Sequence, residues 1–106
     1  MLDPLISVIE TEQSINISFV WVCTGRGGDL ASALRRYLKT CTSTDQVIEF
    51  IVVNNDIKPA RARELCGLVR NSGVEVSLVH LYRKTAESQA LSAAFQHVKG
   101  EKIVVL

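Results

Sequence analysis

Four short apolar runs, each rich in β-branched residues, constrain the fold of this chain more than any other feature. They cover residues 17–23, 47–53, 74–81 and 102–106, and each has the length and composition of a β-strand. The first, second and fourth runs are almost continuously apolar, which predicts strands buried on both faces in a parallel sheet covered by helices. The third run alternates with polar residues and is the best candidate for an edge strand.

Three helical patterns separate the four runs. Asp29 suits the N-cap of a helix over residues 30–40, and Pro59 suits the first turn of a second helix that ends at residues 71–73. A third helix is predicted over residues 85–99. Strands that alternate with helices indicate an α/β fold with three layers, a parallel sheet and right-handed crossovers.

Length, charge and hydropathy exclude several classes of protein. The 106 residues fit one domain, and the net charge of +1 gives no reason to expect nucleic acid as a partner. No apolar run approaches the ~20 residues of a membrane span, so none is predicted. Cys23, Cys41 and Cys66 are too few for a disulfide framework and form no C-x-x-C pair. These features favour reduced thiols and a cytoplasmic location.

Residues 1–16 do not fit the repeat of strands and helices and are interpreted as an N-terminal extension. Apolar residues recur in it at helical spacing, at Leu2, Leu5, Ile6 and Ile9. This spacing predicts a short helix docked on the domain.

In an open parallel sheet, ligands bind beyond the carboxyl ends of the strands. The loop after the first run contains Thr24, Gly25 and Arg26, and its glycines would let backbone N–H groups approach a phosphate or ribose. The G-x-G-x-x-G pattern is incomplete and G-K-[ST] is absent, which excludes a P-loop. A flexible strand-to-helix turn explains the same glycines equally well.

Two further loops lie at the same edge of the predicted sheet. Asn54, Asn55 and Asp56 follow the second run and can read a base edge or a ribose hydroxyl, although such residues more often form ordinary turns. Arg83 and Lys84 precede the third helix, where two cations suit a diphosphate or form a solvated surface pair. These residues complete the predicted nucleotide-binding set.

No catalytic or metal-binding residue is predicted in this chain. His80 and His97 lack an H-E-x-x-H motif and a nucleophile partner, and we interpret both as structural or surface residues. Cys23 has no evident neighbouring base to activate it, and no G-x-S-x-G elbow is present.

Two segments carry a resemblance to a known family. They are EFIVVNN at residues 49–55 and ALSAAFQHVKGEKIVVL at residues 90–106. From Ile17 to Leu106 the sequence resembles the start of family 2 glycosyltransferases, which have the GT-A fold, and the subgroup with polyprenyl-phosphate acceptors looks closest. The resemblance implies a Rossmann-like domain that binds a nucleotide diphosphate sugar, with strand order 3-2-1-4.

Members of that family transfer the sugar to an acceptor, with a divalent Mg or Mn ion on an Asp-x-Asp motif that neutralises the leaving diphosphate. The resemblance places Thr24 and Gly25 near the base and ribose, Asn54 on the usual base-binding Asp, and Lys84 near a basic position. The Pro-x-Tyr-Asn of the family is absent after the first strand, and Asp56-Ile57 replaces its Gly-Ser.

The sequence stops before the Asp-x-Asp motif. We therefore expect a truncated domain over residues 17–106 that is inactive by itself and holds no metal, with a missing C-terminal half or a second copy covering the last strand. The alternative is a non-catalytic α/β module that has kept this fold and binds a protein partner.

Overall fold

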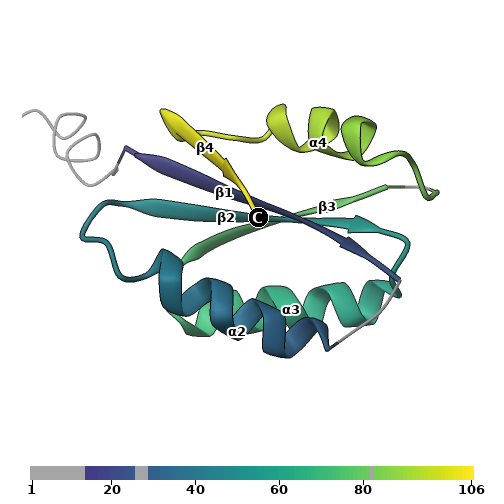
Figure 1. Ribbon diagram of the computed structural model, residues 1–106, viewed down its shortest axis with the longest axis horizontal. Helices are drawn as coiled ribbons and strands as arrows, with labels where there is room; N and C mark the ends of the chain where they lie inside the picture. The colour runs from purple at the N-terminus through teal and green to yellow at the C-terminus, as the bar shows by residue number, and fades with distance from the viewer. Residues whose placement is uncertain (1–13, 26–28, 82) are drawn as a thin grey trace, which may run out of the picture.

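The computed structural model describes residues 14–25, 29–81 and 83–106, in which four strands alternate with three helices. Figure 1 shows how these elements are arranged. The elements are β1 (Ile17–Thr24), α2 (Leu30–Cys41), β2 (Ile48–Asn55), α3 (Pro59–Asn71), β3 (Glu75–His80), α4 (Glu87–Phe95) and β4 (Lys102–Val105). All strands are parallel, and their order is β3-β2-β1-β4. The predicted α/β class and strand order are confirmed.

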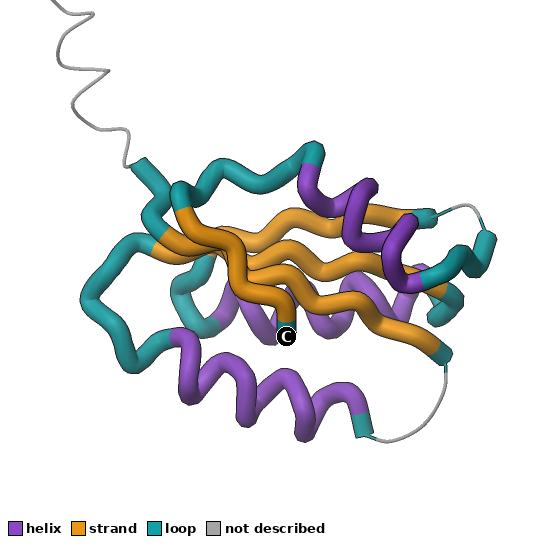
Figure 2. The backbone as a smooth tube through the Cα atoms, turned by 45° about the horizontal axis from the view of Figure 1, so that its top comes forward, coloured by secondary structure: helices purple, strands orange, loops and turns teal. Residues whose placement is uncertain are grey.

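The sheet lies between two helical layers, with α2 and α3 on one face and α4 on the other (Figures 1 and 2). Strand β2 is central, and every residue from Glu49 to Asn55 is buried. The core on the α2/α3 face includes Trp21, Leu34, Phe50, Leu65 and Val69. The core on the α4 face consists of Val20, Ile51, Val53, Ala90 and Ala94. Burial on both sides explains why the second run of the sequence is continuously apolar.

Local signals set the ends of the first two helices. The carboxylate of Asp29 accepts a hydrogen bond from the Ser32 N–H at 3.1 Å and so caps α2. Pro59 is the first residue of α3, where its missing N–H costs nothing. The chain leaves α3 through Gly73, whose φ of +80° lies in the left-handed region that favours glycine. Both helices agree with their predicted bounds to within a residue or so.

The third helix is shorter than predicted, because α4 covers only Glu87–Phe95 instead of residues 85–99. At its carboxyl end, the N–H of Lys99 donates to the Glu49 carboxylate at 2.6 Å, and the N–H of Gly100 donates to Ser18 Oγ at 2.8 Å. At its amino end, side-chain hydrogen bonds from Asn55 hold Thr85. Contacts with distant strands thus replace helical hydrogen bonds at both ends.

The prediction that the fourth run is buried on both faces is wrong. Strand β4 pairs with β1 and lies at the edge of the sheet, and all four of its residues are exposed. The large exposed hydrophobic residues in the described part of the chain are Phe95, Ile103, Val104 and Val105. Helix α4 packs against β1 and β2, which leaves β4 uncovered. Strand β3 is the opposite edge, as predicted.

The predicted docked helix in residues 1–16 falls almost entirely on residues 1–13, which lie outside the described residues. Asn16 is described, and its backbone N–H donates to the Val47 carbonyl at 2.8 Å. Its side-chain oxygen accepts from the Val47 N–H at 3.0 Å. Asn16 therefore joins the segments that lead into β1 and β2.

A cluster of hydrogen bonds around the buried side chains of Ser18 and Glu49 closes the amino end of the sheet. We call Ser18, Glu49, Lys99 and Gly100 the amino-end cluster. The fully buried Glu49 carboxylate accepts from the Ser18 hydroxyl and from the Lys99 N–H, and Ser18 Oγ accepts from the Gly100 N–H. These bonds connect β1, β2 and the turn before β4, so they fix β4 beside β1.

Candidate functional site

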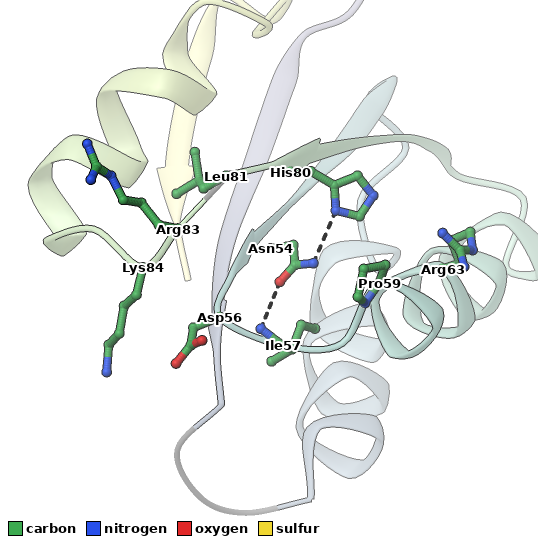
Figure 3. Close-up of a pocket in the computed structure, with 9 residues that line it drawn as sticks. All are labelled: Asn54, Asp56, Ile57, Pro59, Arg63, His80, Leu81, Arg83 and Lys84. Carbon is green, nitrogen blue, oxygen red and sulfur yellow. Dashed lines mark hydrogen bonds between the residues drawn. The ribbon is translucent and has the colours of Figure 1, made fainter.

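A cavity of about 490 Å³ opens beyond the carboxyl ends of β2 and β3 (Figure 3). We call it the carboxyl-end cavity. It is lined by Asn54, Asp56, Ile57, Pro59, Arg63, His80, Leu81, Arg83 and Lys84. Its volume falls within the roughly 300–1,000 Å³ of small-molecule sites, and it lies at the end of the sheet where open parallel α/β domains bind ligands.

The cavity carries an excess of positive charge. Figure 3 shows Arg63 at one end of it, on α3, and Arg83 and Lys84 at the other end, on the loop before α4. Asp56, at the end of β2, is the only carboxylate among the described residues that line it. Within the described ranges, none of these three cations forms a salt bridge with an acidic side chain. An anionic ligand would therefore find unpaired cations at both ends of the cavity.

The Asn54 side chain is engaged inside the protein. It is only 4% exposed, its Oδ1 accepts from the Ile57 N–H at 2.9 Å, and its Nδ2 lies 3.1 Å from His80 Nδ1. Because an amide nitrogen can only donate, His80 Nδ1 is the acceptor and the ring proton is on Nε2. Asn54 thereby orients the exposed His80 ring, whose Nε2 has no hydrogen-bond partner among the described residues.

Asn55 connects β2 to the loop that bears the two cations. Its side chain is 1% exposed, its Nδ2 donates to the Thr85 carbonyl at 3.0 Å, and its Oδ1 accepts from the Thr85 N–H at 2.9 Å. This pair of bonds holds the backbone next to Arg83 and Lys84. The structure therefore gives Asn55 a positioning role, which is close to the ordinary turn role that the sequence left open.

Asp56 differs from both asparagines because its side chain is exposed. Among the described residues it has no hydrogen-bond partner for its carboxylate, and its φ of +84° is unusual for a residue other than glycine. Such local strain is often found at binding sites. The Asp56 carboxylate is thus available to a ligand.

Gly25 brings the first loop against Asp56. A Cβ atom at Gly25 would lie 2.5 Å from the Asp56 carbonyl oxygen, so no other residue fits there without a shift. Thr24 pairs with Asn55 in the sheet, so the loops that follow β1 and β2 both lie at the carboxyl end of the sheet. Neither Thr24 nor Gly25 lines the cavity, and Arg26 lies outside the described residues.

Sequence reasoning missed five residues of the cavity, namely Ile57, Pro59, Arg63, His80 and Leu81. His80 was interpreted as structural or surface, and it is both exposed and part of the lining. A signal for Arg63 was present, because it lies about one turn after the Pro59 helix start and that start faces the carboxyl ends of the strands. A similar signal was present for His80, because it is the last residue of β3 and therefore lies at the carboxyl end of that strand.

The cysteines offer no reactive thiolate. Burial raises the pKa of the Cys23 thiol to about 12, and burial also raises the pKa of Cys41 and of Cys66. All three are free and buried.

Across the described residues, no three His, Cys, Asp or Glu side chains are grouped closely enough to hold a metal ion. In the same part of the chain, no helix has the length and hydropathy needed to cross a membrane.

The fold and the cavity define a three-layer α/β domain with a cationic site at the carboxyl end of its sheet. Comparison of the sequence with models of protein families and with curated proteins finds no match.

Proposed function

We propose that this domain binds the nucleoside diphosphate of a sugar nucleotide and is the donor-binding segment of a glycosyltransferase. The acceptor would be a polyprenyl phosphate in the subgroup that the sequence resembles. The strongest support for this proposal is the cavity of about 490 Å³ at the carboxyl ends of β2 and β3. Three cations and one carboxylate line it.

The charges of the cavity suit a diphosphate. Arg63, Arg83 and Lys84 against Asp56 leave an excess of two positive charges, and Arg and Lys form strong charge-assisted hydrogen bonds with phosphate oxygens. Arg83 and Lys84 also lie just before the amino end of α4, where the helix dipole favours an anion. The His80 Nε2–H adds a neutral donor to the same site.

Transfer of the sugar needs more than binding. The leaving diphosphate gains negative charge, and a divalent metal ion in a full-length enzyme would neutralise that charge as a Lewis acid. The described residues of this chain supply cations and hydrogen-bond donors, and we assign to them the binding and orientation of the donor.

Calorimetric titration of the chain with guanosine and uridine diphosphates tests the proposal. We expect saturable binding of at least one nucleotide, weakened about tenfold or more by the double variant Arg83→Gln/Lys84→Gln, because both charge-assisted contacts are lost. The matched control is Arg35→Gln/Arg36→Gln, which removes two consecutive exposed cations from α2, outside the cavity lining. Equal loss in both double variants would show that the site residues make no specific contact.

A second candidate is a non-catalytic module that binds a protein partner. The observation that favours it is the uncovered strand β4, with Ile103, Val104 and Val105 exposed next to the end of α4. Clustered apolar surface of this kind is typical of interaction sites. Sedimentation of the chain over a range of concentrations tests self-association through this edge. Self-association without any nucleotide binding would favour this candidate over the first.

A further inference from the structure

We propose that the outer edge of β3, together with the face of α3 beside it, binds an extended acidic peptide as an added strand. This surface lies at the opposite edge of the sheet from β4. A second cavity, of about 180 Å³, lies there and is lined by Arg63, Cys66, Arg70, Val76 and Leu78. We call these five residues and the outer edge of β3 the β3 groove.

Strand β3 lacks the features that usually protect an edge strand from pairing. Among the described strands it pairs only with β2, in an unbroken parallel register from Glu75 to His80, so it contains no bulge. Its sequence, EVSLVH, has no proline and no lysine. Alternate residues of an edge strand direct their backbone N–H and C=O groups away from the sheet, and an extended peptide can pair with these groups.

The floor of the β3 groove is apolar. Val76 and Leu78 are half-buried, and both pack against the core on the α2/α3 face, as expected for residues that alternate with Ser77 along the strand. Cys66 lies on α3, which packs against β3, and it is 5% exposed. The volume of about 180 Å³ admits one aliphatic side chain of a bound peptide.

Two unpaired cations flank this floor. Arg63, Cys66 and Arg70 are spaced i, i+3 and i+7, which places them on one face of α3. Both arginines are exposed, and within the described ranges neither forms a salt bridge. The acidic side chains of Glu64 and Glu75 are already paired with other cations. Because guanidinium groups pair with carboxylates in a bidentate geometry, the groove favours a peptide that carries acids.

The spacing of the two arginines indicates the pattern of that peptide. Seven residues of α-helix separate Arg63 from Arg70 by about 10 Å along the axis. In an extended peptide, residues i and i+4 lie on the same face about 13 Å apart, with residue i+2 between them. The long arginine side chains can cover the difference. The groove therefore fits the pattern Glu-x-Leu-x-Glu, which reads the same in both strand directions.

A second copy of the chain fits the groove less well than such a peptide. Antiparallel pairing of β3 with the β3 of another copy would bring the Arg63 and Arg70 side chains of both copies close together. Like charges disfavour this arrangement. The positive charge of the groove therefore selects an acidic partner.

Fluorescence anisotropy with a labelled nine-residue peptide tests the proposal. The peptide carries Glu-x-Leu-x-Glu at its centre with threonine at both x positions, and circular dichroism first confirms that each variant of the full chain is folded. We expect saturable binding that Arg70→Gln weakens about tenfold, because one charge-assisted pair is lost. Arg36→Gln removes an exposed arginine of α2 outside the groove and should match wild type. A peptide with lysine in place of both glutamates should bind at least about tenfold more weakly.

Two N-methylated peptides test whether the peptide adds as a strand. Alternate N–H groups of an extended chain point to opposite sides, so methyl groups on one alternate set block pairing with β3 and methyl groups on the other set do not. Only one of the two methylated peptides should therefore lose binding. Equal affinity of both would show that charge alone holds the peptide, and the proposal would be wrong.

The outcomes also separate this proposal from nucleotide binding. Arg63 lines both cavities, but Arg70 lines only the β3 groove, so Arg70→Gln should leave nucleotide affinity unchanged. Failure of every nucleotide to bind would leave peptide binding at β3 standing. No binding of the acidic peptide, or equal binding of the acidic and lysine peptides, would overturn the proposal. Self-association that Arg70→Gln strengthens would show that the edge pairs with a second copy instead.

Discussion

At the amino end of the sheet, the Glu49 carboxylate is fully buried and bonded to Ser18 and to the Lys99 backbone. At the carboxyl end, the Asp56 carboxylate is exposed and has no partner among the described residues. The two acids lie near opposite ends of the same strand, β2. The comparison shows how the domain divides its polar groups, with one end using them to hold the fold and the other leaving them available to a ligand.

The two asparagines at the carboxyl end differ from Asp56, because their polar groups are already hydrogen-bonded. Asn54 and Asn55 lie at the carboxyl end, yet their side chains are bonded to Ile57, His80 and Thr85. They act as supports for the groups that remain free, because rigid positioning of a site depends on hydrogen bonds behind it. Changes at the amino end should therefore alter stability, and changes at the carboxyl end should alter binding first.

The largest effect on stability is expected for Gly100→Ala. A Cβ there would lie 2.6 Å from Ser18 Oγ and 2.7 Å from the Ser18 backbone nitrogen, so the turn must move and the amino-end cluster must break. We expect a loss of about 3 kcal/mol in the free energy of unfolding, measured in urea. Gly67→Ala is the control, because no atom lies within 4 Å of its new methyl group and the helix should gain about 0.5–1 kcal/mol. Equal effects of the two changes would contradict the role of the turn.

Glu49→Leu should have the next largest effect. The substitution leaves the buried Ser18 hydroxyl and the partly buried Lys99 N–H without their acceptor, which should cost about 2 kcal/mol of unfolding free energy. Glu49→Gln keeps an oxygen that can accept both bonds and should cost less than half as much. If Glu49→Leu is as stable as wild type, the free-energy cost of burying the carboxylate equals the stabilisation from its hydrogen bonds, and the cluster does not stabilise the fold.

Asn55→Ala should affect both stability and binding. Loss of its two hydrogen bonds to Thr85 should cost about 1.5 kcal/mol, and nucleotide affinity should fall because Arg83 and Lys84 are held less firmly. Asn71→Ala, at the exposed end of α3, is the control and should change neither quantity. A stability loss without any change in affinity would show that the loop does not depend on Asn55 for its binding geometry.

The smallest effect concerns pH. Burial raises the pKa of Cys23 to about 12 in the folded chain, so the unfolded chain releases the proton first and stability should fall as pH rises above about 9. By pH 10 the loss from this thiol should be about 1.4 kcal/mol. Urea unfolding at pH 8 and pH 10 measures it, and Cys23→Ala should show a smaller loss. An unchanged pH dependence in that variant would assign the effect to other groups.

Much of the fold was predictable because its signals are local. Periodicity located the four strands, and Asp29, Pro59 and Gly73 marked helix ends through their own side-chain and backbone chemistry. The early end of α4 was not predictable, because it depends on a hydrogen bond from Lys99 to Glu49, fifty residues away in sequence. The exposure of β4 was missed for a related reason, since an apolar run does not reveal whether a helix covers it.

The candidate site was predicted only in outline. Asp56, Arg83 and Lys84 were identified from their place after the strands, and all three line the cavity. The engagement of the Asn54 amide depends on His80, which is 26 residues away and reaches it only through the pairing of β2 with β3. Loop position therefore indicates which residues lie near a ligand site, and long-range contacts decide which of their polar groups stay free.

We infer that the domain binds its ligand at one end of the sheet and uses the other end for structural closure. Two-dimensional 1H–15N NMR spectra of the chain, recorded during addition of guanosine diphosphate, test this division directly. We expect saturable shifts of the backbone amides of Asp56, Arg63, His80, Arg83 and Lys84, with those of Ser18, Glu49 and Gly100 unchanged. Shifts centred on the amino-end cluster, or none at saturating nucleotide, would contradict it.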